Sequence, residues 1–94
     1  MGAHSKTDHA DFMHVELKLC FTFANVAETN RKIGHTESAK SALDKAELGY
    51  ATLQRFLADP KHSRHLTEKD IRHITAELWR LRERLDALQS GVRL

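Results

Sequence analysis

The sequence has few of the residues that interrupt helices and few of those that build sheets. Its 94 residues include one proline and four glycines, and only 6% are aromatic. β-Branched residues form no alternating run of the kind that marks a strand. These absences argue against a sheet and favour long helices. A chain of this length is one domain, which can bury a modest core without disulfides or a structural metal.

Cysteine and long apolar runs are also scarce. The single cysteine, Cys20, excludes an internal disulfide and lies in an apolar helical run, where a buried, reduced thiol is expected; a reactive thiol is the alternative. No apolar segment approaches the roughly 18 residues that a membrane span needs. Residues 1–12 lack the apolar region of a signal peptide. We therefore expect a cytoplasmic protein without a membrane partner, whose residues 1–6 are flexible or a remnant of cloning.

The chain has little excess of either charge, with a formal net charge of +2 at pH 7. Residues 1–60 carry seven Lys/Arg against eight Asp/Glu, whereas residues 61–94 carry eight against five. This basic excess is too small and too interleaved with acids to indicate nucleic acid by itself. If nucleic acid is nevertheless the partner, we expect the loose stripe of Arg72, Arg80 and Arg84 to contact phosphates.

Apolar spacing, caps and turns predict two helices before the only proline, at about residues 8–33 and 36–58. Gly34 suits the left-handed residue that follows a helix, and Asp59-Pro60 ends the second one. Gly49, inside the second helix, is expected to let another helix approach closely. The first helix is predicted to bury Phe12, Val15, Leu19, Phe23, Val26 and Ile33, widened by Met13, Cys20, Ala24 and Ala27. The second is predicted to bury Ala39, Ala42, Leu43, Ala46, Tyr50, Leu53, Phe56 and Leu57.

A third helix, at about residues 67–90, follows a loop over residues 60–66. Thr67 and Asp70 begin it as an approximate capping box. Its apolar seam alternates spacings of 3 and 4 through Ile71, Ile74, Leu78, Leu81, Leu85, Leu88 and Val92. Because short connections make neighbouring helices antiparallel, the expected fold is all-α, a three-helix, up-down-up bundle of residues 7–94.

Large apolar residues, alanines and a turn glycine occur at regular spacing in the central hairpin: Phe23, Val26, Ala27, Gly34, Ala39, Leu43 and Ala46. In this pattern the hairpin resembles a single tetratricopeptide repeat (TPR) over about 34 residues. Asn30 replaces the usual aromatic residue, and Ala51 stands where a proline would end the second helix. The hairpin therefore looks like a stand-alone TPR-like unit with a long third helix. The resemblance implies that Ala24, Glu28 and Arg31 face a peptide groove.

Site chemistry is sparse. The sequence has no nucleophile elbow and no glycine-rich phosphate loop, so we expect no enzyme, no cofactor and no small-molecule substrate. Seven histidines include His62, His65 and His73, which could hold zinc or nickel. No metal site is predicted, because no further ligands accompany them at a recognised spacing.

Surplus apolar residues indicate a protein partner. Phe12, Met13, Leu17 and Phe21 spread round the first helix, so we do not expect a three-helix bundle to cover them all. Trp79 lies off the third helix's seam, either as an interface anchor or packed over the bundle edge. The predicted partner-binding set is Phe12, Leu17, Phe21, Glu28, Arg31 and Trp79. The prediction is a small, non-catalytic protein–protein interaction module, a homodimer; the alternative is a helical nucleic-acid-associated regulator.

Overall fold

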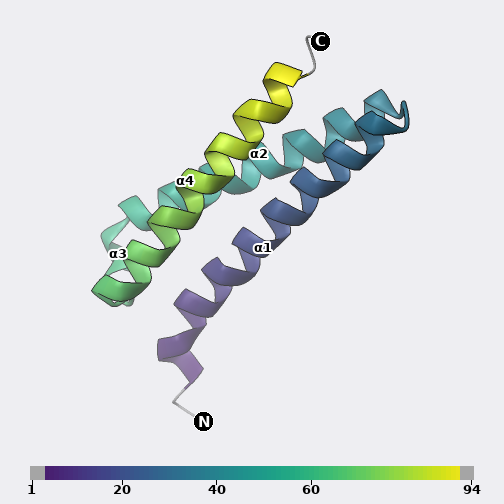
Figure 1. Ribbon diagram of the computed structural model, residues 1–94. Coiled ribbons are helices and arrows are strands. Elements are labelled where there is room, and N and C mark those ends of the chain that lie inside the picture. Colours follow the sequence, from purple (N-terminus) through teal and green to yellow (C-terminus); the bar gives the residue numbers. More distant parts are fainter. Residues whose placement is uncertain (1–3, 92–94) are drawn as a thin grey trace.

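A computed structural model describes residues 4–91 and the side chains of residues 10–90. Its helices are α1 (His4–Lys32), α2 (Thr36–Ala58), the short α3 (Pro60–Ser63) and α4 (Glu68–Gly91), with no strand among the described residues. Figure 1 shows α1 and α2 as an antiparallel hairpin, with α4 running in the same direction as α1. The predicted all-α class and up-down-up order are confirmed.

The helix bounds differ from the prediction mainly at the N-terminus. α1 begins at His4 rather than near residue 8, so residues 4–6 of the segment expected to be flexible are helical. Residues 1–3 of that segment, and Val92 of the predicted seam, lie outside the described residues.

The turn between α1 and α2 depends on Gly34, as predicted. Gly34 has a φ of +87°, in the left-handed region. Its N–H donates to the Arg31 carbonyl at 3.2 Å, and the His35 N–H donates to the Asn30 carbonyl at 2.8 Å. This pair of bonds is a Schellman motif, which satisfies carbonyls at the end of α1 and reverses the chain.

The inward face of α1 is not the predicted one. Met13, Leu17, Cys20, Ala24 and Ala27 are buried, whereas the large members of the predicted stripe are not. Phe23 is half-buried, and the exposed ones are Phe12, Val15, Leu19, Val26 and Ile33. The reason is the close packing of α1 against α2, which small side chains permit and a row of large ones would prevent.

The contact between Cys20 and Gly49 shows how close the helices come. A Cβ added to Gly49 would lie 2.5 Å from the Cys20 Sγ, a separation that real Cβ atoms do not adopt. The predicted role of Gly49 is therefore confirmed, and so is the burial of Cys20, which is 2% exposed. Burial, and secondarily the Glu16 carboxylate, raise the pKa of this thiol to about 11. The buried thiol therefore stays protonated near neutral pH.

α4 packs along the hairpin through its predicted seam, whose buried members are Ile74, Leu78, Leu81, Leu85 and Leu88. The predicted capping box is also present. The Asp70 N–H donates to Thr67 Oγ1 at 3.0 Å, and the Thr67 N–H donates to Asp70 Oδ2 at 3.1 Å. Two otherwise unpaired donors are thereby satisfied where α4 begins.

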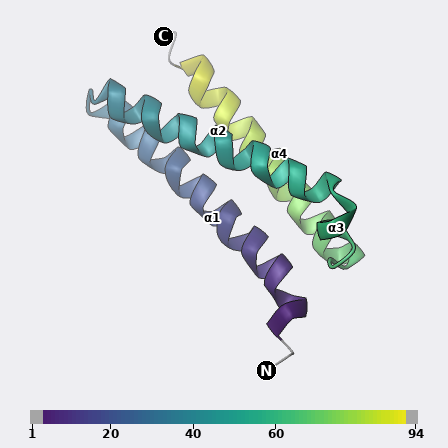
Figure 2. The same cartoon turned by 180° about the vertical axis from the view of Figure 1, so that it is seen from behind.

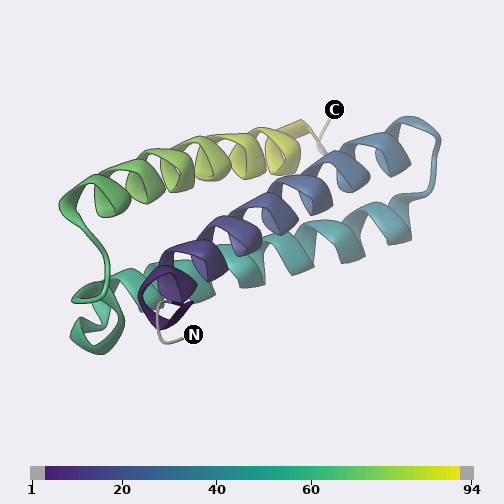
Figure 3. The same cartoon turned by 90° about the horizontal axis from the view of Figure 1, so that it is seen from below.

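The stretch predicted as a loop contains α3. Asp59 ends α2, but its Oδ1 also accepts the Lys61 N–H at 3.0 Å and so caps a new helical turn. Pro60 occupies the first turn of that helix, where its missing N–H costs nothing. The sequence signal was interpreted only as a stop, whereas it is both a stop and a start. In Figure 3 this turn lies beside the end of α2, and the connection that follows it rises to the start of α4.

Ion pairs join α4 to both arms of the hairpin. Arg82 binds Glu47 of α2 through two hydrogen bonds, at 2.9 and 2.6 Å. Arg84 donates to Glu28 of α1 at 2.7 Å. The hydrogen bond from Arg82 is the largest cause of the lowered pKa of Glu47, and burial opposes it. The pair with Arg82 therefore favours the ionised form of Glu47 in the folded state.

Replacing Glu47 by glutamine should lower stability at neutral pH by about 1–2 kcal/mol, because the bidentate pair with Arg82 is lost. The folded-state pKa of Glu47 lies below its ordinary value of 4.5. Its contribution is therefore present above pH 4.5 and is lost as the pH falls through the folded value. Denaturant unfolding of both proteins from pH 7 to pH 3 should show the difference shrinking below pH 4.5. A difference that stays constant with pH would contradict the assignment.

Candidate interaction surface

The exposed apolar residues of α1 form one continuous face. They recur at alternating spacings of 3 and 4, with two threonines completing the series. We define the outer stripe as Phe12, Val15, Leu19, Thr22, Val26, Thr29 and Ile33. At 3.6 residues per turn this face is turned by roughly 150° from the buried face of α1. Its five large side chains remain 41–60% exposed. α1 therefore carries two apolar faces, and the bundle covers only one.

The outer stripe is fixed to α2 along one edge. The Phe12 ring stacks on Phe56 with centroids 5.3 Å apart, and Phe56 stacks in turn on His62 at 4.2 Å. Further along, the Lys45 ammonium lies 5.7 Å from the centroid of the Phe23 ring. Figure 2 shows α1 and α2 side by side over this region. These contacts hold the stripe on a rigid support.

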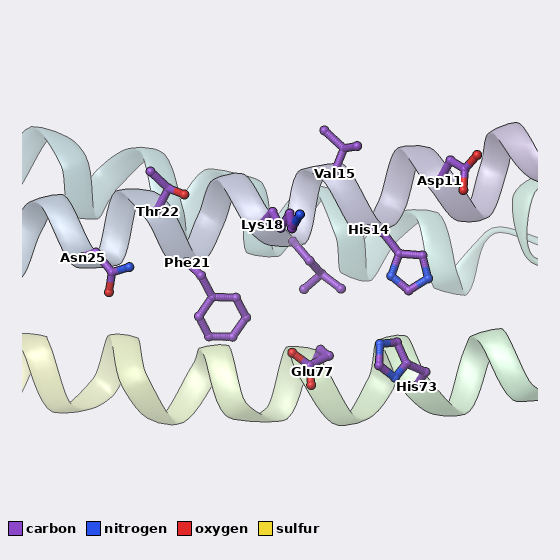
Figure 4. A pocket seen from close by; sticks show the side chains of 10 residues that line it. Asp11, His14, Val15, Lys18, Phe21, Thr22, Asn25, His73 and Glu77 are labelled. Atoms are coloured by element: carbon purple, nitrogen blue, oxygen red, sulfur yellow. The ribbon is translucent and has the colours of Figure 1, made fainter.

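Along its other edge α1 borders a groove against α4. In Figure 4 His14 and Phe21 point from α1 toward α4, whereas Val15 points away. The rings of His14 and His73 lie 5.2 Å apart across this groove. Since His62 stacks on Phe56, the three histidines considered as metal ligands do not converge. The part of the chain with described side chains contains no cluster of three or more His, Cys, Asp or Glu residues that could hold a metal ion.

Leu17 and Phe21 differ from their predicted exposure. Leu17 is 4% exposed and belongs to the core, so its assignment to a surface was wrong. Phe21 is half-buried and packs against the core at the groove between α1 and α4. Of the predicted phenylalanines, only Phe12 presents an exposed side chain, at 42%.

α4 covers the face that the TPR resemblance assigns to a peptide groove. Ala24 has no exposure, and Glu28 accepts from Arg84. The Arg31 Nη1 donates to the Leu88 carbonyl at 2.6 Å. A peptide could reach this face only after α4 moved away, so in this structure Glu28 and Arg31 hold the bundle together.

Trp79 lies off the α4 seam, as predicted, and is 67% exposed. It borders a second shallow groove, between α2 and α4, with Tyr50, Leu57 and Leu78. The neighbouring Arg82 guanidinium lies over the Tyr50 ring at 4.9 Å. Trp79 is thus a single large exposed residue on the far side of α4 from α1.

The three arginines of the nucleic-acid alternative each lie beside a carboxylate. Arg72 lies 4.0 Å from Glu68, Arg80 lies 3.7 Å from Glu77, and Arg84 lies 2.7 Å from Glu28. Phosphates would have to compete with these carboxylates for the guanidinium groups.

Five residues that the spacing predicts to be buried are exposed: Phe12, which is also in the predicted partner-binding set, and Val15, Leu19, Val26 and Ile33. Sequence reasoning did not include Thr22 or Thr29 in any face. The sequence does contain a signal for the outer stripe. Two sets of residues recur along α1 at helical spacing, one made of large residues and threonines and the other rich in small residues. Only the second permits a close helix contact.

No helix among the described residues is both long and apolar enough to cross a membrane. Comparison of the chain with protein-family models, curated proteins and solved structures gives no match.

Proposed function

We propose that the chain is a small, non-catalytic protein–protein interaction module of the cytoplasm, and that it self-associates as a homodimer through the outer stripe of α1. The observation that supports this proposal is the exposed stripe itself. It keeps the spacing of a coiled-coil seam over three heptads, and such a seam is buried when a second helix packs on it.

The exposed side chains of the outer stripe support weak association. Complete burial of a Val, Leu, Ile or Phe side chain stabilises by about 1.5–3 kcal/mol, so a half-exposed one contributes roughly 1 kcal/mol when it is covered. Five such side chains from each copy contribute on the order of 10 kcal/mol, against an association cost of about 4–15 kcal/mol. At the low end of that cost the surplus is about 6 kcal/mol, which corresponds to a dissociation constant of some tens of micromolar. We therefore expect a weak dimer that forms only at high chain concentration.

The test is the solution mass across a dilution series, measured by light scattering in low and high salt. The wild-type protein should approach twice its chain mass of 10.8 kDa at high concentration. Val15→Glu places two carboxylates in the dimer interface and should weaken association about 100-fold. Glutamate is a better helix former than valine, so α1 itself should stay folded. High salt should not dissociate an apolar interface.

Leu48→Glu is the matched control. Leu48 is 66% exposed, but it lies on α2 and outside the outer stripe. This variant should dimerise like the wild type. A wild-type mass of 10.8 kDa at every concentration would reject self-association, and equal weakening by Leu48→Glu would reject the outer stripe as the interface.

A further inference from the structure

We infer that the second copy lies antiparallel on α1, in a single register that the charges beside the outer stripe select. This inference rests on the proposed function, because it concerns the same surface. Its starting observation is that the two edges of the stripe carry different charges.

The edge toward α4 carries Asp11, Lys18, Asn25 and Lys32 at intervals of seven residues. Asp11, Lys18 and Asn25 border the groove against α4, and all four residues are exposed. The edge toward α2 carries Glu16, Phe23 and Asn30 at the same interval. Each copy of the stripe therefore has an acidic and a basic end on the α4 edge, and a single acid on the α2 edge. Lys32 at the basic end also lies 3.6 Å from Glu28 Oε2 of its own helix, in an exposed ion pair that leaves it accessible to a second copy.

A parallel dimer would bring unlike edges together. In parallel coiled coils each residue on one edge of the seam contacts a residue on the other edge of the partner helix, five positions later in the sequence. Asp11 would then meet Glu16 of the second copy, and by symmetry this contact would occur twice. Lys18 would meet Phe23 and gain no opposite charge. The parallel arrangement thus contains repulsion between like charges and no ion pair to compensate it.

An antiparallel dimer brings like edges together, α4 edge against α4 edge. When Leu19 lies opposite Thr22 of the second copy, Val15 lies opposite Val26 and Phe12 opposite Thr29. One wholly apolar layer, Val15 with Val26, then forms on each side of the two-fold axis, and Ile33 lies beyond the last layer. In this register Asp11 lies beside Lys32 of the second copy, and Lys18 lies beside Asn25. The same ion pair forms twice, once at each end of the interface.

A shift of one heptad changes the charges. In one direction it would place Lys18 beside Lys32 of the second copy and leave Asp11 outside the interface. In the other direction it would place Lys18 beside Lys18 of the second copy and Asp11 beside Asn25, so both shifts bring lysines together. The two threonines fit either register, because a helical threonine can donate its hydroxyl proton to a carbonyl within its own helix. The charges therefore select both the orientation and the register.

The decisive variant is Asp11→Lys, with the dimer dissociation constant measured by sedimentation equilibrium at low salt. In the antiparallel register the new lysine faces Lys32 of the second copy. Two attractions become repulsions, and the dimer should weaken about tenfold. In a parallel dimer the same lysine would face Glu16 and tighten association. The double variant Asp11→Lys/Lys32→Glu restores opposite charges and should recover the wild-type affinity to within about threefold.

Asp44→Lys is the matched control for net charge. Asp44 is an exposed acid on α2, outside the stripe and its edges, so the control should dissociate like the wild type. At high salt all four proteins should converge. Thermal unfolding of each variant confirms that the helices remain intact.

The outcomes separate the two proposals. A monomeric wild-type protein would overturn the proposed function and this inference together. A wild-type dimer that Asp11→Lys tightens or leaves unchanged would overturn the antiparallel register alone, as would a double variant that fails to recover affinity while remaining folded.

Discussion

Leu81→Ala is expected to lower the free energy of unfolding by about 3 kcal/mol. Truncating a fully buried leucine to alanine typically costs about 2–5 kcal/mol. Leu81 has no exposed surface and lies at the centre of the α4 seam. α4 is attached to the hairpin largely through this seam, so there is little other packing to fill the cavity. For a chain of this size the loss corresponds to a fall in melting temperature of roughly 15 °C.

The control for Leu81→Ala is Leu48→Ala, which removes the same atoms from a side chain that is 66% exposed. It should change stability by less than about 0.5 kcal/mol. Both proteins are measured at one chain concentration, because association also contributes to apparent stability. Similar effects of the two substitutions would show that α4 does not depend on its seam.

The second large effect is expected at the crossing of α1 and α2. Gly49→Ala would normally stabilise a helix by about 1 kcal/mol. Here the added methyl group meets the Cys20 Sγ, and overpacking of a core costs about 1–3 kcal/mol. We expect a net loss of about 1 kcal/mol, measured by denaturant unfolding.

Cys20→Ala tests the cause of that loss. It removes the sulfur that the new methyl group would meet, so Gly49→Ala should become stabilising in the Cys20→Ala background. The coupling between the two substitutions should be about 1–2 kcal/mol. Additive effects would mean that the helices separate at another point, and that Cys20 does not set their distance.

The class of fold followed from the sequence because its signals are local. Gly34 turns the chain, Thr67 and Asp70 cap α4, and the seam of α4 keeps one spacing over most of the helix. Each of these features, the turn, the cap and the seam with its alternating spacings of 3 and 4, depends only on residues that are close in sequence. The start of α3 at Pro60 was not predicted, because the Asp59-Pro60 pair was interpreted only as the end of α2. Asp59 in fact ends α2 and caps α3.

The inward face of α1 could not be chosen in this way. Apolar residues occur on two faces of α1. Their spacing does not show which face is buried, so it cannot distinguish the exposed Leu19 from the buried Cys20. Which face turns inward depends on how close α2 lies, and that distance is set by Gly49, some 29 positions from Cys20. The candidate surface was mispredicted for the same reason, because the residues excluded from the core are the ones that form it.

The ion pairs between α4 and the hairpin could not be predicted from the sequence either. Glu28 and Arg84 are 56 positions apart and belong to helices whose rotation about their own axes the sequence leaves open. Their pairing removes two residues from the surfaces proposed for a peptide and for nucleic acid. Trp79 was easier to place, because its position depends only on the seam of its own helix.

The hydrogen bond between Arg31 and the Leu88 carbonyl joins residues 57 positions apart, and this separation bears on how the chain folds during synthesis. α1 and α2 are synthesised before α4 and can pair before it, while the end of α4 follows later. The part of α1 beside that end is built from Ala24 and Ala27. Because alanine carries little apolar surface, this part of the nascent hairpin exposes little apolar surface before the end of α4 is made.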